Sequence, residues 1–230
     1  VEWTLANGAK VIIKSTNFKD DEILFNAWSP GGTSLYGLND EVSADFTPQI
    51  LAMSGIADFD NITLDKMLSD KVFSISPFVN ELREGFNGNS SVKDVETLLQ
   101  MVYLYFTQPR FDETSFQSYI SRMAGILENK AASPEAAFQD TLAVVMANYH
   151  ERARPMTKEL LQEASLKRIR TIARERFRNA SDFCFFFVGN INPDEFKPLV
   201  EKYIGGILST PEKGNWRNLN VDAPEGVVEK

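Results

Sequence analysis

Histidine and cysteine are almost absent from this sequence, which holds one of each among its 230 residues, His150 and Cys184. A single cysteine cannot form a disulfide within the chain, so the disulfide-stabilised scaffolds of small secreted proteins are excluded. A catalytic zinc site usually takes three protein ligands from His, Cys, Asp and Glu and leaves one position open for water. We therefore expect no catalytic metal site in this chain.

Long apolar runs and an excess of positive charge are missing as well. No run approaches the roughly 18 residues that a membrane helix needs, and the first residues do not resemble a signal peptide. The net charge is −8, which disfavours a general nucleic-acid binder, because such a protein needs a basic surface. The apolar content of 43% and the aromatic content of 11% are sufficient for a folded core.

Several segments have features typical of β-strands. Asn7-Gly8 lies between two apolar stretches and predicts a tight hairpin turn. Residues 23–29 predict a strand that ends at Pro30-Gly31-Gly32, and residues 72–76 alternate between apolar and polar, as in a strand with one buried face. Residues 183–188 are apolar throughout, so we expect a central strand that is covered on both faces for much of its length.

Helices are predicted mainly between these strands. Ser91, Asp112, Ser133 and Asn192 are the predicted N-caps of four of them, and residues 165–177 predict another. Helices grouped against a mostly antiparallel sheet make an α+β domain. From about Ser209 the composition shifts to Pro, Gly, Asn and charged residues. We predict one domain over residues 1–208 and a linker or flexible tail over residues 209–230.

The order and spacing of these segments resemble one family of enzymes, the pitrilysin/insulinase zinc peptidases. The Asn-Gly hairpin, the strand that ends in Pro-Gly-Gly, and residues 179–183, 188–190 and 200–205 carry this resemblance. Residues 154–157 are similar to a segment in the second half of bacterial members. The resemblance implies the α+β fold that these peptidases share with the mitochondrial processing peptidase.

In active domains of that family, the first helix after the early hairpin carries the zinc motif His-x-x-Glu-His. The corresponding stretch here, residues 40–49, holds no histidine. The resemblance therefore implies a zinc-free, inactive domain from the C-terminal half, which supplies a wall of the substrate chamber. It assigns no catalytic or metal-binding residue to this chain and leaves the substrate-binding residues unidentified.

The resemblance also implies what the parent enzyme does. The parent would hydrolyse peptides with a zinc-bound water and a glutamate base, both on another domain. The partners of this domain would be the N-terminal, zinc-carrying half of the same polypeptide and peptide substrates. The alternative is a structural or assembly subunit, or a peptide-binding module, of the same fold. The compartment is left open, with a bacterial cell envelope or periplasm as one option for the parent.

Several residues could be assigned a functional role, and for each of them we favour a structural role instead. We expect His150 to lie at the surface or to cap a helix, and Cys184 to be an inert buried thiol. The basic run over residues 167–178 is interpreted as a solvated helix face. Residues 20–22 predict a surface turn, because they lack the spacing and the glycine of a calcium loop. Residues 30–32 predict a turn that ends a strand, because no phosphate-loop pattern follows.

Overall fold

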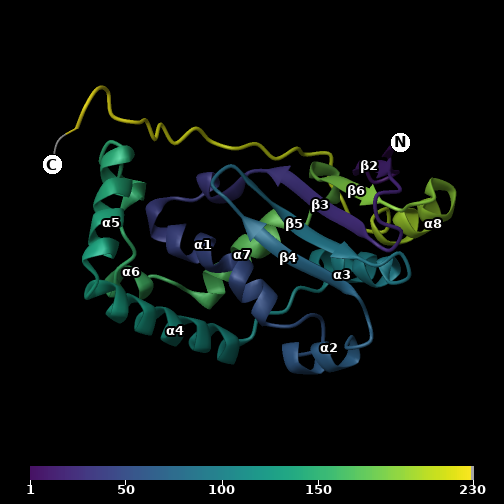
Figure 1. The fold of residues 1–230 in the computed structure, drawn as a ribbon, viewed down its shortest axis with the longest axis horizontal. Helices are drawn as coiled ribbons and strands as arrows, with labels where there is room; N and C mark the ends of the chain where they lie inside the picture. Colours follow the sequence, from purple (N-terminus) through teal and green to yellow (C-terminus); the bar gives the residue numbers. More distant parts are fainter. Residues whose placement is uncertain (229–230) are drawn as a thin grey trace.

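The computed structural model describes residues 1–228 and shows one sheet covered by helices (Figure 1). The six strands are β1 (Glu2–Thr4), β2 (Lys10–Ser15), β3 (Ile23–Pro30), β4 (Phe73–Val79), β5 (Arg83–Ser90) and β6 (Cys184–Gly189). Their order in the sheet is β1-β2-β6-β3-β5-β4. Each neighbouring pair in this order is antiparallel except β2 with β6. The predicted α+β class with a mostly antiparallel sheet is confirmed.

Eight α-helices accompany the sheet in the described part of the chain. They are α1 (Leu38–Met53), α2 (Asn61–Met67), α3 (Val95–Thr107), α4 (Glu113–Ala131), α5 (Pro134–Met146), α6 (Lys158–Leu161), α7 (Leu166–Arg176) and α8 (Pro193–Tyr203). Short 3-10 turns lie at Gly32–Leu35, Glu151–Ala153 and Ala180–Asp182. Within residues 1–228, no helix combines the length and the apolar character that crossing a bilayer requires.

The predicted caps are right for three helices and wrong for one. The side chains of Asp112, Ser133 and Asn192 accept hydrogen bonds from the first turns of α4, α5 and α8. The prediction at Ser91 is wrong, because α3 begins at Val95 and Asp94 is the residue before it. The Ser91 hydroxyl instead donates to Asp94 Oδ2 at 2.8 Å, so the two residues close a turn ahead of the helix.

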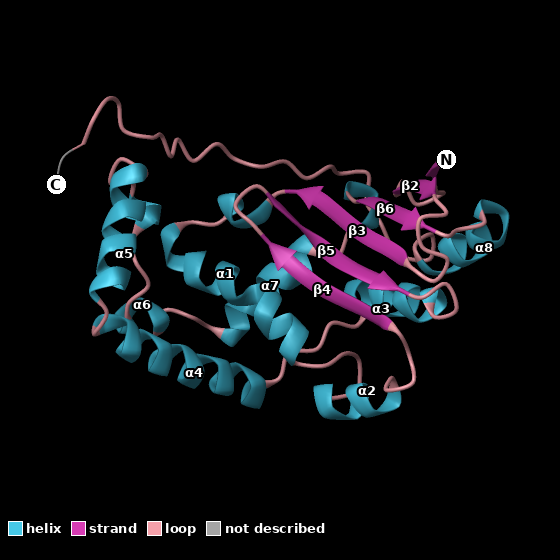
Figure 2. Ribbon diagram, in the orientation of Figure 1, coloured by secondary structure: helices cyan, strands magenta, loops and turns pink. Residues whose placement is uncertain are grey.

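The main core lies between one face of the sheet and the helices α1, α3, α7 and α8, whereas α4 and α6 pack against α1 and α7 in a separate cluster (Figure 2). Phe86 of β5 is fully buried. Its ring centroid lies 5.3 Å from that of Tyr105, 5.7 Å from that of Phe106 and 4.9 Å from that of Phe177. Because these partners come from α3 and from the end of α7, this aromatic cluster holds both helices on the inner face of the sheet.

Strand β6 is covered on one face, which corrects the prediction that both faces are covered. Phe185 and Phe187 are fully buried, whereas Phe186 is half-buried and Val188 is 38% exposed. Side chains alternate between the two faces of a strand, so Phe186 and Val188 share the face that the helices leave open. Because every residue of this strand is apolar, the sequence does not distinguish the covered face of β6 from its open face.

The Pro30-Gly31-Gly32 segment ends β3 in a tight turn, as predicted. Gly32 has φ of 65°, and a Cβ atom there would lie 2.1 Å from the Asn80 carbonyl oxygen. Its N–H donates to Glu84 Oε2 at 2.5 Å, and the Ser29 hydroxyl donates to Glu84 Oε1 at 2.8 Å. A carboxylate of β5 therefore fixes this turn, and glycine is required by both space and backbone angle.

The segment after α8 runs along the surface toward the end of the molecule where α5 lies (Figure 1). Its first part is held by backbone donors. The N–H of Thr210 donates to Asn179 at 2.9 Å, and the N–H of Gly214 donates to Asp182 at 3.0 Å. The N–H of Arg217 donates to the Ser34 hydroxyl at 3.0 Å. The boundary at residue 208 stays a prediction, and residues 229 and 230 of the predicted tail lie outside the described residues.

Candidate functional site

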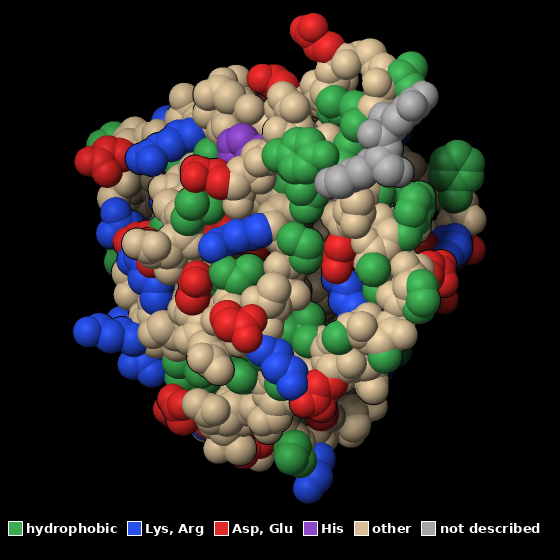
Figure 3. Space-filling view, turned by 90° about the vertical axis from the view of Figure 1, so that its left-hand side faces the viewer, with side chains coloured by type: hydrophobic (Ala, Val, Ile, Leu, Met, Phe, Trp, Pro, Cys, Tyr) green, Lys and Arg blue, Asp and Glu red, His purple; other side chains and the backbone are tan. Residues whose placement is uncertain are grey.

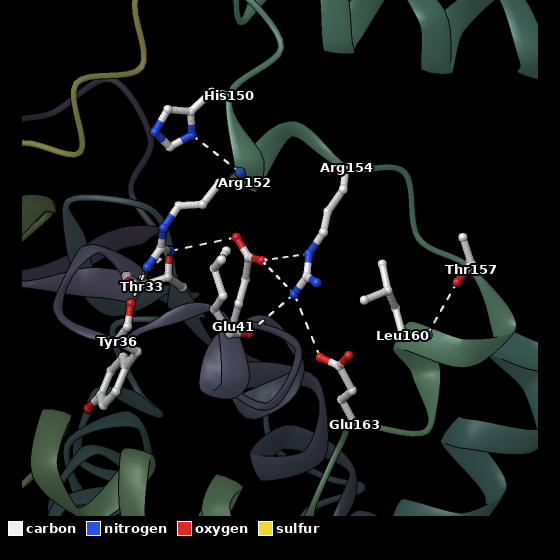
Figure 4. Close-up of polar contacts among 10 residues, drawn as sticks. Thr33, Tyr36, Glu41, His150, Arg152, Arg154, Thr157, Leu160 and Glu163 are labelled. Carbon is white, nitrogen blue, oxygen red and sulfur yellow. Dashed lines mark hydrogen bonds and ion pairs between the residues drawn. The ribbon is translucent and has the colours of Figure 1, made fainter.

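Helix α1 carries residues 40–49, the stretch in which the family's zinc motif would be expected. Glu41 lies in its first turn, and its carboxylate faces two guanidinium groups (Figure 4). Glu41 Oε1 lies 3.6 Å from Arg152 Nη1, and Glu41 Oε2 lies 3.2 Å from Arg154 Nη2. The side chains of Glu41 and Arg152 are each only 12% exposed. This carboxylate is therefore neutralised by the chain itself.

A zinc ion does not fit these residues. Residues 40–49 contain no histidine, and the Glu41 carboxylate already has two cationic partners. In the part of the chain that the structure describes, no group of three or more His, Cys, Asp or Glu side chains could hold a metal ion. A catalytic zinc site needs three such ligands and an open position, so we derive no metal-dependent step from this chain.

Arg152 and Arg154 lie in the segment that follows α5. His150 Nδ1 accepts a hydrogen bond from the Arg152 N–H at 3.2 Å, so His150 caps a 3-10 turn, in agreement with its interpretation as a cap. Arg154 Nη2 also donates to the Leu38 carbonyl at 3.2 Å and lies 3.6 Å from Glu163 Oε2. Arg154 thus connects the first turn of α1 to the loop that precedes α7.

The basic run on α7 is only partly a solvated face, so that interpretation is wrong for two of its members. Arg168 donates to both carboxylate oxygens of Asp40, at 2.7 and 2.9 Å. Arg176 Nη1 lies 3.6 Å from Glu84 Oε1. The other four basic residues, Lys167, Arg170, Arg174 and Arg178, are exposed. Arg168 and Arg176 therefore attach α7 to α1 and to β5, a role that the helical pattern alone does not reveal.

Glu84 should make the stability of the chain depend on pH. This side chain is 2% exposed, and burial raises the pKa of its carboxyl from 4.5 to about 7, against bonds from Gly32 and Ser29 and the charge of Arg176. The folded state therefore binds this proton more tightly than the unfolded chain. Stability should fall as pH rises from about 4.5 to about 7, by about 3 kcal/mol at most.

The measurement is urea unfolding at pH 5 and at pH 8. The matched variant is Glu84→Gln, which keeps the shape of the side chain and removes its titration. We expect the free energy of unfolding to fall less between these two pH values in the variant than in the wild type. An equal fall in both proteins would show that Glu84 is not the group responsible.

The open face of the sheet is the second candidate site. Its central part is an apolar surface formed by six residues of β2, β3 and β6, namely Ile12, Leu24, Trp28, Cys184, Phe186 and Val188. We call these six residues the outer sheet patch. Leu24 is 49% exposed and is paired in register with Val188. Trp28 is paired in the same way with Cys184. None of the six side chains carries a charge when the thiol is protonated, so this surface favours apolar contacts.

Cys184 of the outer sheet patch has no feature of a nucleophile. Its side chain is half-buried, and burial raises the pKa of its thiol, with a smaller opposing effect from Lys10. A raised pKa keeps the sulfur protonated, and the thiolate is the reactive form. The interpretation as an inert thiol agrees with this position, although the side chain is less buried than expected.

A row of amide and hydroxyl groups begins within the outer sheet patch, at Asn26 in the middle of β3, and continues across β5 to β4. Asn26 Nδ2 donates to Asn87 Oδ1 at 2.7 Å, and the Ser74 hydroxyl donates to Asn89 Oδ1 at 2.8 Å. These side chains lie on the solvent side of the sheet. Side-chain amides both donate and accept hydrogen bonds, so this row can also bond to the backbone of an extended peptide.

The edge of the sheet next to this row is poorly suited to pairing with another strand. Strand β4 is the edge strand, and Pro77 lies in its middle. Proline has no N–H, and in a sheet it is found where that missing donor faces away from the neighbouring strand. A peptide added along β4 would lack a hydrogen bond at Pro77, so binding over the open face is favoured over binding along the edge.

Comparison with known sequences gives one clear group of relatives. No family model matches the chain. Over 212 residues the chain is 26% identical to a zinc protease PQQL-like protein of Arabidopsis thaliana. The match covers 92% of this chain and 20% of the plant protein. The chain therefore spans about a fifth of the length of this relative.

Comparison with solved structures identifies the fold. The chain matches the periplasmic protease PqqL from Escherichia coli with a TM-score of 0.81 and 15% identity, over 97% of this chain and 26% of that one. It matches a peptidase M16 inactive domain from Pseudomonas fluorescens with a TM-score of 0.75 and 15% identity, over 94% of this chain and 53% of that one. The predicted metallopeptidase-like fold is confirmed.

Proposed function

We propose that this chain is a non-catalytic, substrate-chamber domain of a larger zinc endopeptidase of the pitrilysin type, the family whose sequences and fold it is confirmed to resemble. The observation that carries the proposal is that the chain resembles a zinc protease but lacks the residues that would bind zinc. The chain is similar to a protein named a zinc protease over 92% of its own length. Yet the helix expected to hold the zinc motif has no histidine, and two arginines form ion pairs with Glu41 in its first turn.

The outer sheet patch would supply contacts to the substrate. An extended peptide can lay its apolar side chains on Trp28, Phe186 and Leu24 and bond its backbone to the neighbouring amides, while the hydrolytic chemistry belongs to another domain. Contacts away from the reacting bond orient that bond, and a peptidase gains rate from such orientation. The N-terminal, zinc-carrying half and peptide substrates are thus the partners that we propose for this domain.

The experiment compares the intact polypeptide with a variant that lacks residues 1–208 of this chain. We expect the variant to lose at least about 10-fold in kcat/KM for peptides, because a factor of 10 corresponds to about 1.4 kcal/mol and one oriented contact supplies that much. Zinc content, measured by elemental analysis, should stay the same. The 230-residue chain alone should hydrolyse no peptide, and when added back it should restore part of the activity.

Two outcomes would contradict the proposal. Equal peptide turnover at equal zinc occupancy would make the domain a passenger and favour the structural or assembly alternative. Peptide hydrolysis by the isolated chain, retained after treatment with a metal chelator and absent from a mock purification, would show a catalytic site that the geometry does not contain.

A further inference from the structure

Helix α5 presents an apolar stripe to solvent. Phe138 is 62% exposed, Leu142 is 42% exposed and Met146 is 54% exposed. The spacing of four residues places these three side chains on one side of the helix. Val145 is the one buried side chain of α5, a helix that the structure describes in full. The rest of this helix therefore has little packing within the chain.

An exposed apolar stripe is unexpected on a helix as short as α5, which needs packing to be stable. The helix has 13 residues, and isolated helices of this size are marginal in water, since most helical stability in proteins comes from packing of one face. At its first turn α5 is fixed by the Ser133 cap. A Lys130–Asp140 ion pair with an N–O distance of 2.6 Å ties it to α4. These polar contacts hold the first half of α5 and leave the apolar stripe uncovered.

The position and the charge of the stripe limit what can cover it. Helix α5 stands at the end of the molecule opposite β2 and α8 (Figure 1). Figure 3 looks onto this end and shows hydrophobic side chains lying between charged ones. Between Phe138 and Met146 the only charged residue is Asp140, and Lys130 neutralises it. A neutral apolar stripe suits an apolar protein surface and has nothing with which to attract a polyanion.

The solved structures indicate which protein surface this is. The fold of this chain accounts for 53% of the inactive-domain chain from Pseudomonas fluorescens and for 26% of the PqqL chain from Escherichia coli. In both proteins the fold is therefore part of a polypeptide that is longer by one or more units of similar size. An apolar helix at one end of such a unit is placed to contact the next unit.

We propose that the stripe of Phe138, Leu142 and Met146 is the surface by which this domain docks onto a neighbouring domain of the same parent polypeptide. The proposal rests on the proposed function, because that function supplies the parent. It adds a surface and a partner that the outer sheet patch does not involve. Docking covers the stripe and supplies the packing that α5 lacks on its own.

The test is hydrogen exchange of the α5 amides over residues 135–146, measured in the intact polypeptide and in the 230-residue chain alone. We expect exchange to be at least 10-fold slower in the intact polypeptide. The double variant Phe138→Gln, Met146→Gln should remove that protection in the intact polypeptide. The matched control is Phe18→Gln, a substitution of a 91% exposed phenylalanine far from α5 in the sequence, and it should leave the protection unchanged.

The wild-type comparison decides the proposal even if the double variant does not fold. Equal exchange of α5 in the two wild-type proteins would overturn it. A dimer of the 230-residue chain that protects α5 and that the double variant dissolves, with equal protection of α5 in the intact monomer, would overturn it in favour of a second copy. Peptide turnover and zinc content report on the proposed function separately, so protection of α5 without any effect of the domain on turnover would reject that function alone.

Discussion

Replacing Phe186 with aspartate should lower kcat/KM of the intact polypeptide for peptides by about 10-fold, with its zinc content unchanged. Phe186 lies in the middle of the outer sheet patch, where it is paired in register with Asn26 on one side and with Ile12 on the other. The substitution would remove the Phe186 ring and place a carboxylate on this face, where a bound peptide would have to cover it. Lys10 and Lys14 of β2 share this face and are exposed, so they would offset part of the cost of desolvating this charge. A loss of about 1.4 kcal/mol in transition-state stabilisation gives a 10-fold change.

Two matched variants separate a loss of binding from a loss of folding. Phe18→Asp introduces the same charge at a position that is 91% exposed in the loop before β3, and it should leave kcat/KM unchanged. Phe186→Leu keeps an apolar side chain on the patch and should retain most of the activity. Thermal unfolding of each variant checks that the domain is folded. Wild-type turnover in a folded Phe186→Asp variant would show that peptide substrates do not bind to the outer sheet patch.

The sequence predicted those parts of the fold that depend on short-range signals. The caps at Asp112, Ser133 and Asn192 and the turn at Pro30-Gly31-Gly32 each rest on residues within a few positions of one another, and the structure contains all of them. Backbone groups at helix ends and in turns must find a partner locally, so the residues that supply this partner can be recognised in the nearby sequence.

Helix α1 was not evident from the residue pattern because its environment removes the usual signal. Eight of its 16 residues are buried, including Ser43 and Thr47 as well as Phe46 and Ile50. Polar and apolar residues therefore both face the interior, and no amphipathic stripe forms. Pro48 in the middle of the helix adds a further signal against helix. Packing between β4 and α7 overrides local preference here.

The candidate sites could not be predicted, because they depend on contacts that are distant in sequence. The pair formed by Glu41 and Arg154 joins residues 113 positions apart. The outer sheet patch is formed by β2, β3 and β6, which pair across the sheet. Nothing in the local sequence predicts that β6 lies between β2 and β3. Resemblance to a family identified the fold and the missing zinc ligands, and only the structure shows the face on which a peptide can lie.

Replacing Phe86 with alanine should lower the free energy of unfolding of the chain by about 3–5 kcal/mol. The side chain is fully buried, and the rings of Tyr105, Phe106 and Phe177 surround it with centroid distances of 4.9 to 5.7 Å. Truncation removes these contacts and leaves a cavity between β5 and the helices, which rigid aromatic neighbours cannot fill. Urea unfolding at constant pH measures the change.

The matched control for this truncation is Phe18→Ala, which removes the same atoms from a side chain that is 91% exposed. Surface substitutions of this kind usually change stability by less than about 0.5 kcal/mol. The two variants thus have the same chemistry and differ only in burial. A loss below about 1 kcal/mol for Phe86→Ala would mean that the aromatic cluster does not hold α3 and α7 on the sheet.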